Sequence, residues 1–276
     1  MGFAVIGDRG MFGAEMVEFL ISQQTQVTGF NRDSMDLNSS VDRLAKQLQG
    51  IDVIINAVAY TAVDKAESEL ELANLVNGEY AGKLAQAAKF VGAKFMHIST
   101  DYVFDGSATS PYSTNAPTNP QSAYGSSKLL GENLVADSGA NYTVFRTAWL
   151  YGKHGRSFPK VIFDKASRGY TLRVVNDQFG QPTWTKDLAQ QVYAFAGLDN
   201  APRIVHAVSS GKTTWFEFAK EIVGKYPIEP VSSTEFVTAA KRPSYSVLDN
   251  SSDFVTPIGD WRERWQGAKS EVLKSL

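Results

Sequence analysis

Tyr124 and Lys128 are the residues whose chemistry is most readily inferred from the sequence, because they form a Tyr-x-x-x-Lys pair. Residues four positions apart on a helix leave the same face, so the phenol and the ammonium should lie close together. A phenol with a pKa of about 10 is a poor acid–base catalyst at neutral pH until a neighbouring charge stabilises its anion. Lys128 would supply that charge, so the pair predicts proton transfer at a substrate oxygen.

Thr100 is the third candidate for this chemistry. It follows a predicted strand over residues 94–99, and the end of that strand reads Ser99-Thr100-Asp101-Tyr102. In sheets of parallel strands, ligands bind at the carboxyl edge. The Thr100 hydroxyl could therefore donate a hydrogen bond to a substrate oxygen and hold it near Tyr124.

A glycine-rich turn follows the first predicted strand, residues 3–6. Gly7, Gly10 and Gly13 form a G-x-x-G-x-x-G pattern that runs directly into a helix. Glycines there allow a tight turn, close approach of the backbone to a pyrophosphate and close helix–strand packing. The helix N-terminus adds free N–H groups and a partial positive charge. The pattern predicts a dinucleotide site, to which the intervening residues also contribute: Asp8, Met11 and Phe12.

The end of the second predicted strand, residues 26–30, indicates which dinucleotide is bound. A carboxylate at this position usually binds the adenosine ribose of NAD, whereas this chain has Asn31-Arg32. A guanidinium can pair with a 2′-phosphate, so we predict a preference for NADPH, with NADH the second option. The alternative is that Arg32 is an ordinary solvated surface residue.

Further cofactor contacts are expected on two loops. One follows Arg32 and should meet the adenine ring; the other follows the strand that begins at Ile51, where small side chains would let a cofactor lie against the backbone. The residues concerned are Asp36, Leu37, Ala57, Ala59 and Tyr60.

The elements that must position these residues alternate regularly in the first half of the chain. Strands are expected at 3–6, 26–30, 51–57, 94–99 and 142–148, with helices at 14–22, 41–48, 70–91 and from near 124. Continuous apolar strands alternating with helices imply a parallel sheet covered on both faces. Residues 1–150 are therefore predicted to form a doubly wound α/β domain of the Rossmann type.

The pattern changes after residue 150. Helices are expected at 158–167, 186–197 and 214–225, with a short strand at 171–175 and recurrent proline-bearing loops. Residues 151–276 are predicted to form a smaller α/β substrate-binding lobe, interwoven with the first and leaving a cleft between them.

Composition excludes several other classes of protein. With 27 basic and 29 acidic residues among 276, the chain has no surplus of positive charge for nucleic acid. The absence of cysteine excludes disulfides, cysteine nucleophiles and thiolate metal sites. The three histidines, His97, His154 and His206, lack metal-ligand spacing, so no metal is predicted. Because the sequence shows neither a signal peptide nor a long apolar run, no membrane association and a cytoplasmic location are expected.

Several longer strings carry a resemblance to a known family. They occupy residues 56–67, 99–106, 124–132, 146–152, 177–183 and 242–249. On these strings the chain resembles, over essentially its whole length, the dTDP-4-dehydrorhamnose reductase family of extended short-chain dehydrogenases/reductases. The resemblance implies hydride transfer from NADPH to the C4 ketone of dTDP-4-dehydro-L-rhamnose. It assigns substrate positioning to Thr100, proton donation to Tyr124, and cofactor binding with pKa control to Lys128.

The resemblance also implies substrate contacts. Trp149 would line the sugar pocket, although core packing is an alternative, and Thr61, Val63 and Tyr102 fall in matching substrate-contact strings. Arg242 would pair either with the nucleotide pyrophosphate or with a carboxylate in a structural salt bridge.

The resemblance bears on metal binding and assembly as well. Some relatives hold magnesium at a dimer contact, and Glu15 falls in a comparable place. We identify no partner carboxylates and predict no metal site. A homodimer is compatible with the resemblance.

Two alternatives remain at this stage. The first is a nucleotide-sugar epimerase or dehydratase. The dehydratase is disfavoured, because Thr100 is followed by Asp101-Tyr102 and not by the Asp-Glu pair that water elimination commonly uses. A non-catalytic subunit, similar to the regulatory subunit of methionine adenosyltransferase, is compatible with an intact Thr–Tyr–Lys set.

Overall fold

The computed structural model describes residues 1–274, and its larger lobe is built on one six-stranded parallel sheet. The strands lie in the order β10-β5-β4-β3-β1-β2. Their bounds are β1 Gly2–Ile6, β2 Gln26–Phe30, β3 Val53–Asn56, β4 Lys94–Thr100, β5 Asn141–Thr147 and β10 Ile204–His206. The predicted doubly wound parallel sheet is confirmed.

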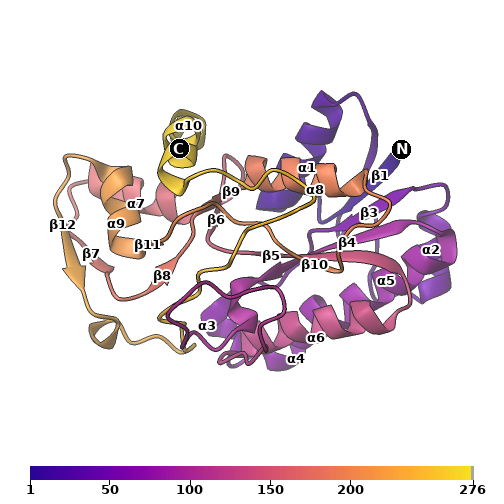
Figure 1. Ribbon diagram of the computed structural model, residues 1–276, viewed down its shortest axis with the longest axis horizontal. Helices are drawn as coiled ribbons and strands as arrows, with labels where there is room; N and C mark the ends of the chain where they lie inside the picture. The colour runs from indigo at the N-terminus through magenta and orange to yellow at the C-terminus, as the bar shows by residue number, and fades with distance from the viewer. Residues whose placement is uncertain (275–276) are drawn as a thin grey trace.

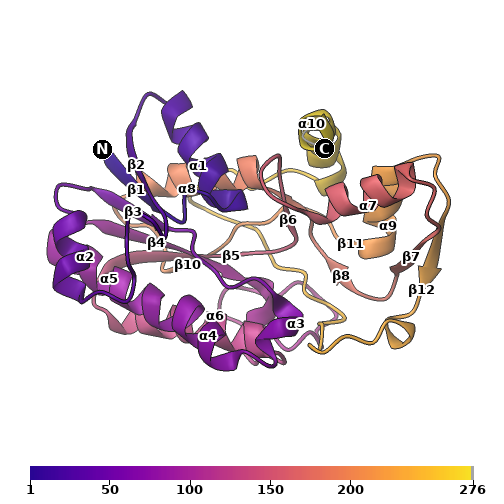
Figure 2. The same cartoon turned by 180° about the vertical axis from the view of Figure 1, so that it is seen from behind.

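Helices cover both faces of this sheet, as Figures 1 and 2 show. Alternate residues of β1 point to opposite faces, so Phe3 and Val5 pack under α1 (Met11–Ser22) and α8 (Thr185–Ala196). Ala4 and Ile6 belong to the second apolar cluster, to which three helices of the other face contribute. These are α2 (Val41–Gln47), α5 (Tyr80–Val91) and α6 (Ala123–Asp137).

The helix predicted over residues 70–91 contains a π-helical turn. It consists of α4 (Leu70–Asn74), the π-helix η1 (Leu75–Glu79) and α5. A Cβ on Gly131 of α6 would lie 2.2 Å from the Asn77 carbonyl oxygen, so the glycine lets the two helices approach closely. Single π-helical turns often mark functional sites.

The smaller lobe has its own aromatic core, which includes Tyr151, Phe218, Trp261 and Trp265. Three helices and three two-stranded sheets surround it. The helices are α7 (Phe158–Ser167), α9 (Trp215–Val223) and α10 (Trp261–Lys274). The paired strands are β7 (Leu172–Val175) with β12 (Ile228–Val231), β8 (Phe179–Gly180) with β11 (Thr213–Thr214), and β6 (Leu150–Tyr151) with β9 (Thr183–Trp184).

The chain passes between the lobes more than once. After α7 and β7 in the smaller lobe, it returns to lay α8 on the large sheet and to add β10 beside β5 (Figure 1). It then returns to the smaller lobe for α9 and α10. Among residues 1–274, no helix combines the length and the hydropathy needed to cross a membrane.

Candidate active site

The structure brings Thr100, Tyr124 and Lys128 together at the carboxyl edge of the sheet. Thr100 is the last residue of β4 and is followed by the 3-10 helix η2 (Asp101–Val103). Ser122 caps α6 by accepting a hydrogen bond from the Gly125 N–H at 3.1 Å, which places Tyr124 in the first turn. A Cβ at Gly125 would lie 2.3 Å from the Tyr102 carbonyl oxygen, so this glycine allows η2 to pack directly on α6.

Tyr124 is held in its protonated form in the protein alone. Burial raises the pKa of its phenol to about 12; a hydrogen bond with the Thr100 side chain opposes the rise, and the Asp101 carboxylate adds to it. The rings of Tyr102 and Tyr124 meet edge to face, with centroids 5.6 Å apart. A protonated phenol at this position is ready to donate a proton.

Lys128 is buried beside the sheet. Its Nζ donates a hydrogen bond to the Ile98 carbonyl oxygen at 2.6 Å and lies 3.4 Å from His97 Nε2. Burial lowers the pKa of Lys128 to about 8, although the Glu132 carboxylate acts to raise it. Arg146 pairs with Glu132 at 2.7 Å and offsets much of that negative charge. An amine with a pKa near ambient pH can both give and take a proton.

Asp101 is an active-site carboxyl that the sequence interpretation did not include. It is buried, and its Oδ1 accepts a hydrogen bond from the Thr100 hydroxyl at 2.9 Å. Burial raises its pKa to about 6, and hydrogen bonding from Ser246 and Thr100 works against that rise. Its place next to Thr100 in the sequence was the available signal.

The glycine turn forms a cradle that fits a dinucleotide. Gly7 has a φ of +91°, and a Cβ there would lie 3.1 Å from the Ala57 carbonyl carbon and the Val58 nitrogen. A Cβ on Gly13 would lie 2.0 Å from the Gly7 carbonyl oxygen, so only glycine allows α1 to start this close to the turn. Gly10 is the N-cap and has no side chain, which leaves N–H groups of the first turn available to a phosphate.

The other residues predicted for the cradle differ in what they can offer. Phe12 buries its side chain in the core, so only its backbone could meet a cofactor, whereas Met11 is half-buried at the surface of the turn. Asp8 Oδ2 accepts a hydrogen bond from Asn31 at 3.4 Å. Within residues 1–274, Asp8 Oδ1 is buried without a hydrogen-bond partner, as expected of a group that meets a ligand.

The corner where the adenosine ribose would lie contains two guanidinium groups. Arg32 is exposed just beyond the end of β2, and Arg9 pairs with Asp33 at 2.5 Å. The sequence interpretation included Arg32 and missed Arg9. Asp36 accepts hydrogen bonds from the backbone and side chain of Asn38, so its carboxylate is satisfied locally. Leu37 packs at the edge of the second apolar cluster.

Asn77, on the π-helical turn, anchors the loop that follows β3 and carries Ala57, Ala59 and Tyr60. Its Oδ1 accepts from the Tyr60 N–H at 2.8 Å, and its Nδ2 donates to the Tyr60 carbonyl oxygen at 3.1 Å and to Ser127 Oγ at 2.9 Å. Asn77 thereby ties the predicted cofactor loop to the helix that carries Tyr124 and Lys128. The sequence interpretation missed Asn77, because its partners are distant in sequence.

Trp149, just after β5 and directly before β6, has a strained backbone conformation. Its φ is +46°, which is unusual for a bulky residue and, where it persists, often marks a functional site. Its indole stacks on Trp215 with ring centroids 3.5 Å apart, and a Cβ on Gly180 would lie 2.4 Å from the indole. The side chain is partly exposed and borders a buried apolar cluster, so it combines core packing with a surface open to a ligand.

Arg242 forms a salt bridge with Asp64. Its two terminal nitrogens donate to the two Asp64 oxygens at 2.9 and 2.8 Å, which is the structural alternative left open by the sequence. The hydrogen bonds from Arg242 lower the pKa of the Asp64 carboxyl. The pair joins the C-terminal half to α3 (Val63–Ala66), which begins two residues after exposed Thr61.

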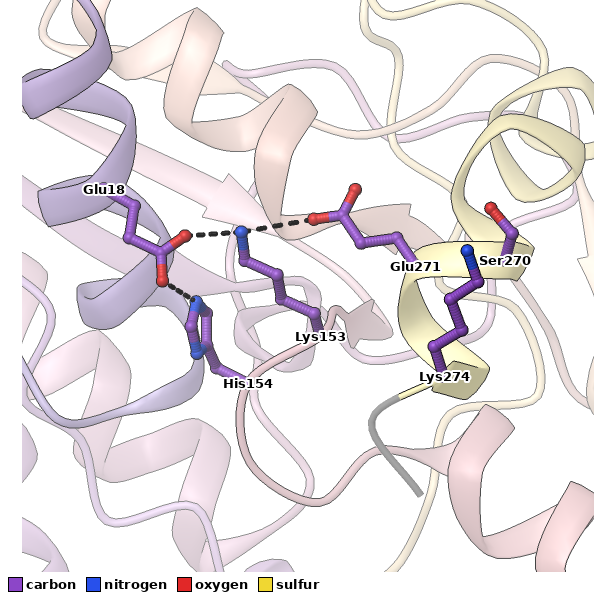
Figure 3. A pocket seen from close by; sticks show the side chains of 6 residues that line it. All are labelled: Glu18, Lys153, His154, Ser270, Glu271 and Lys274. Atoms are coloured by element: carbon purple, nitrogen blue, oxygen red, sulfur yellow. Dashed lines mark ion pairs between the residues drawn. The ribbon is translucent and has the colours of Figure 1, made fainter.

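The residues around Glu15 do not fit a magnesium ion. Lys153 places its ammonium 3.9 Å from Glu15. It also pairs with Glu271 at 3.2 Å and with Glu18, as Figure 3 shows. A lysine therefore already supplies the positive charge that these carboxylates would offer to a cation. Residues 1–274 contain no group of three or more His, Asp or Glu side chains arranged to hold a metal ion.

The sheet, the glycine cradle and the Thr–Tyr–Lys set together define an extended short-chain dehydrogenase/reductase. A family model described as "RmlD substrate binding domain" matches residues 1–276. The chain belongs to this family, that of the dTDP-4-dehydrorhamnose reductases, and the predicted resemblance is confirmed.

Individual relatives match nearly the whole chain. A dTDP-4-dehydrorhamnose reductase of Burkholderia thailandensis is 38% identical, over 95% of this chain and 96% of its own. A probable dTDP-4,6-dihydroxy-2-methyloxan-3-one 4-ketoreductase of Streptomyces antibioticus is 36% identical, over 99% and 96%. The solved structure of dTDP-4-dehydrorhamnose reductase from Bacillus anthracis, in complex with NADP, is 32% identical with a TM-score of 0.93, over 98% of this chain and 100% of that one.

Proposed function

We propose that this protein is an NADPH-dependent reductase that converts dTDP-4-dehydro-L-rhamnose to dTDP-L-rhamnose. The observation that carries the proposal is that Thr100, Tyr124 and Lys128 come together at the carboxyl edge of the same sheet whose first strand ends in the glycine turn, in a member of this reductase family. The named activity of the Burkholderia relative and the NADP bound by the Bacillus structure support it.

The cofactor would be held by residues 1–150. The turn at Gly7, Gly10 and Gly13 would receive the pyrophosphate, Arg32 the 2′-phosphate, and Lys128 the nicotinamide ribose. When bound, NADPH supplies the hydride. The remaining cofactor contacts are proposed to come from Asp8, Met11, Phe12, Asn31, Asp36, Leu37, Ala57, Ala59 and Tyr60.

The protein's own part in the reaction is to deliver one proton. As the ketone carbon gains a hydride and the C=O π bond breaks, the oxygen becomes an alkoxide. Tyr124 donates its phenolic proton to that oxygen, and Thr100 holds the oxygen in place by a hydrogen bond. The phenolate left on Tyr124 is stabilised by protonated Lys128 until it is reprotonated.

The sugar-nucleotide site would be formed by side chains from both parts of the chain, residues 1–150 and residues 151–276. Trp149, at the boundary of the lobes, would stack on the sugar, and Thr61, Val63 and Tyr102 would line the opposite side. Arg242 would reach the pyrophosphate from its place beside Asp64. A different dTDP-linked 4-keto sugar is a second candidate substrate, because the Streptomyces antibioticus relative is named for one.

We also propose a cytoplasmic location and a homodimer. NADPH and nucleotide sugars are small intracellular metabolites, which supports the location. Light scattering coupled to size-exclusion chromatography tests the dimer, and fractionation of cells expressing the protein tests the location.

The deciding experiment follows the loss of NADPH absorbance with dTDP-4-dehydro-L-rhamnose and with a panel of other dTDP-4-keto sugars. Tyr124→Phe should lower kcat about 100- to 10,000-fold while retaining NADPH binding. Tyr170→Phe, at an exposed tyrosine in the smaller lobe, is the matched control and should match the wild type. NADPH binding without turnover of any sugar would contradict the proposal and favour a regulatory subunit.

A further inference from the structure

A buried chain of three side chains runs from the end of β3 to the catalytic lysine. Asn56, His97 and Lys128 are 1%, 0% and 1% exposed. Asn56 and His97 are register partners on the parallel strands β3 and β4, and Asn56 Nδ2 lies 3.1 Å from His97 Nδ1. His97 Nε2 lies 3.4 Å from Lys128 Nζ. The imidazole therefore lies directly between an amide and the lysine.

The hydrogen bonds of Asn56 determine which ring nitrogen of His97 carries the proton. The backbone N–H of Val58 can only donate, and it lies 3.1 Å from Asn56 Oδ1, which accepts. The Asn56 NH₂ group must then face His97, so His97 Nδ1 is the acceptor. A neutral imidazole that accepts at Nδ1 carries its proton on Nε2. Burial, aided by the charge of Lys128, lowers the pKa of His97 well below its usual range and keeps the ring neutral.

This tautomer directs an N–H toward the lysine. A charged ammonium has only donors, so it would face the Nε2–H donor to donor, whereas an uncharged amine has a lone pair that can accept it. We propose that His97 is a positioning residue that, in the tautomer imposed by Asn56, presents its Nε2–H to Lys128 and favours the uncharged amine. His97 therefore acts through Lys128 and touches neither substrate nor cofactor.

Other charged groups around Lys128 act on its protonation in opposite directions. Glu132, on the same helix, attracts the ammonium, and Arg146 of β5 moderates that attraction. Tyr124 lies one turn before Lys128, and Asp101 of η2 acts on Tyr124. His97 is the titratable side chain of β4 in direct contact with Lys128. This inference rests on the proposed reaction. There, a weakly bound proton of Lys128 would replace the proton that Tyr124 donates in each turnover.

The tautomer can be tested without cofactor or turnover. The chain has three histidines, so ¹⁵N-histidine labelling gives three imidazole spin systems, and the His97→Gln variant identifies the one from His97. We expect a bare Nδ1 and a protonated Nε2 throughout the neutral pH range. Asn56→Asp replaces the donor with an acceptor, so it should move the proton to Nδ1 in a near-isosteric side chain. A protonated Nδ1 in the wild type would overturn the inference.

The effect on Lys128 is read from the pH dependence of kcat with saturating NADPH and sugar nucleotide. His97→Leu removes the N–H that favours the uncharged amine. The pH at which kcat falls on the alkaline side, the alkaline limb of the profile, should therefore rise by about one unit, the size expected for losing one hydrogen bond to the amine. Asn56→Asp should shift it in the same direction. His97→Gln can still donate to the amine and should leave the limb where the wild type has it.

The outcomes separate this inference from the proposed function. If His97 had a purely structural role, its replacement would lower stability and kcat but would not displace the alkaline limb of the kcat profile. An undisplaced limb in both His97→Leu and Asn56→Asp, in an active enzyme, would overturn the inference. Should His97→Leu fail to fold, Asn56→Asp and His97→Gln still decide the question. Absence of turnover in the wild type would refute the proposed function, while the imidazole spectra would still decide the tautomer.

Discussion

Replacing Gly13 with alanine tests how tightly the cofactor cradle is built. The added Cβ would lie 2.0 Å from the Gly7 carbonyl oxygen, and real Cβ atoms essentially never come within 3.0 Å of such a neighbour. The first turn of α1 must therefore withdraw by at least about 1 Å, because the Gly7 carbonyl that the new Cβ meets belongs to the backbone and cannot rotate away as a side chain would. The N–H groups of that turn would move away from the cofactor phosphates by a similar amount.

The size of the effect follows from the hydrogen bonds lost. A hydrogen bond to a charged group contributes about 1.5–3 kcal/mol, so losing one N–H···phosphate contact should raise the Kd for NADPH about 10- to 150-fold. Overpacking between α1 and the turn should also lower the free energy of unfolding by about 1–3 kcal/mol. The variant should stay folded, with NADPH binding and stability weakened by similar free energies.

Isothermal titration calorimetry with NADPH, together with urea unfolding, measures both quantities. Gly267→Ala is the matched control: its Cβ would meet open space on α10, so NADPH affinity should be unchanged and stability slightly increased. Wild-type NADPH affinity in a folded Gly13→Ala protein would refute the reasoning, because the turn would then accommodate a Cβ without moving its N–H groups away from the phosphates.

Three further changes test the cofactor corner, the substrate side and the buried carboxyl. Arg32→Ala should reduce the ratio of kcat/KM for NADPH to that for NADH by about 10- to 150-fold, and an unchanged ratio would remove Arg32 from the cofactor site. Gly180→Ala places a Cβ 2.4 Å from the Trp149 ring, so steady-state kinetics should show KM for the sugar nucleotide raised about 2- to 10-fold with NADPH binding preserved; an unaltered KM would mean that Trp149 does not contact substrate. Burial raises the pKa of Asp101 from 3.8 in the unfolded chain to about 6, so its ionisation costs stability as pH rises through that interval. In urea unfolding, Asp101→Asn should therefore raise the free energy of unfolding by about 3 kcal/mol above pH 7 and by about half as much near pH 5. A pH-independent difference between the variant and the wild type would contradict the assigned pKa.

Much of the larger lobe could be predicted from the sequence because its strands are buried on both faces. Near-continuous apolar runs such as 3–6 and 53–55 leave little ambiguity. The three-residue strand β10 has too short a signal to be separated from a loop. Helix α10 was missed although Trp261, Trp265, Ala268 and Val272 follow helical spacing, because charged residues dominate the segment.

Some residues of the candidate site could likewise be predicted from the sequence, and others could not. Tyr124 and Lys128, and the three glycines of the turn, are related by short sequence spacings, so local rules predict their geometry. His97 becomes informative only when β3 and β4 pair, since its neighbours are Asn56, 41 residues earlier, and Lys128, 31 residues later. The π-helical turn likewise depends on packing against α6, and intrinsic helix propensity alone does not foresee it.

The late arrival of β10 and α8 at the large sheet has a consequence for how the protein is made. When residues 1–150 have left the ribosome, five of the six strands exist, but β5 is still an open edge and α8 does not yet cover its part of the apolar face. Open edges and uncovered apolar faces favour pairing with other chains. Completion of the six-stranded sheet must await synthesis through residue 206. The nascent chain therefore exposes this strand edge and this apolar surface for as long as the segment 151–206 is being translated.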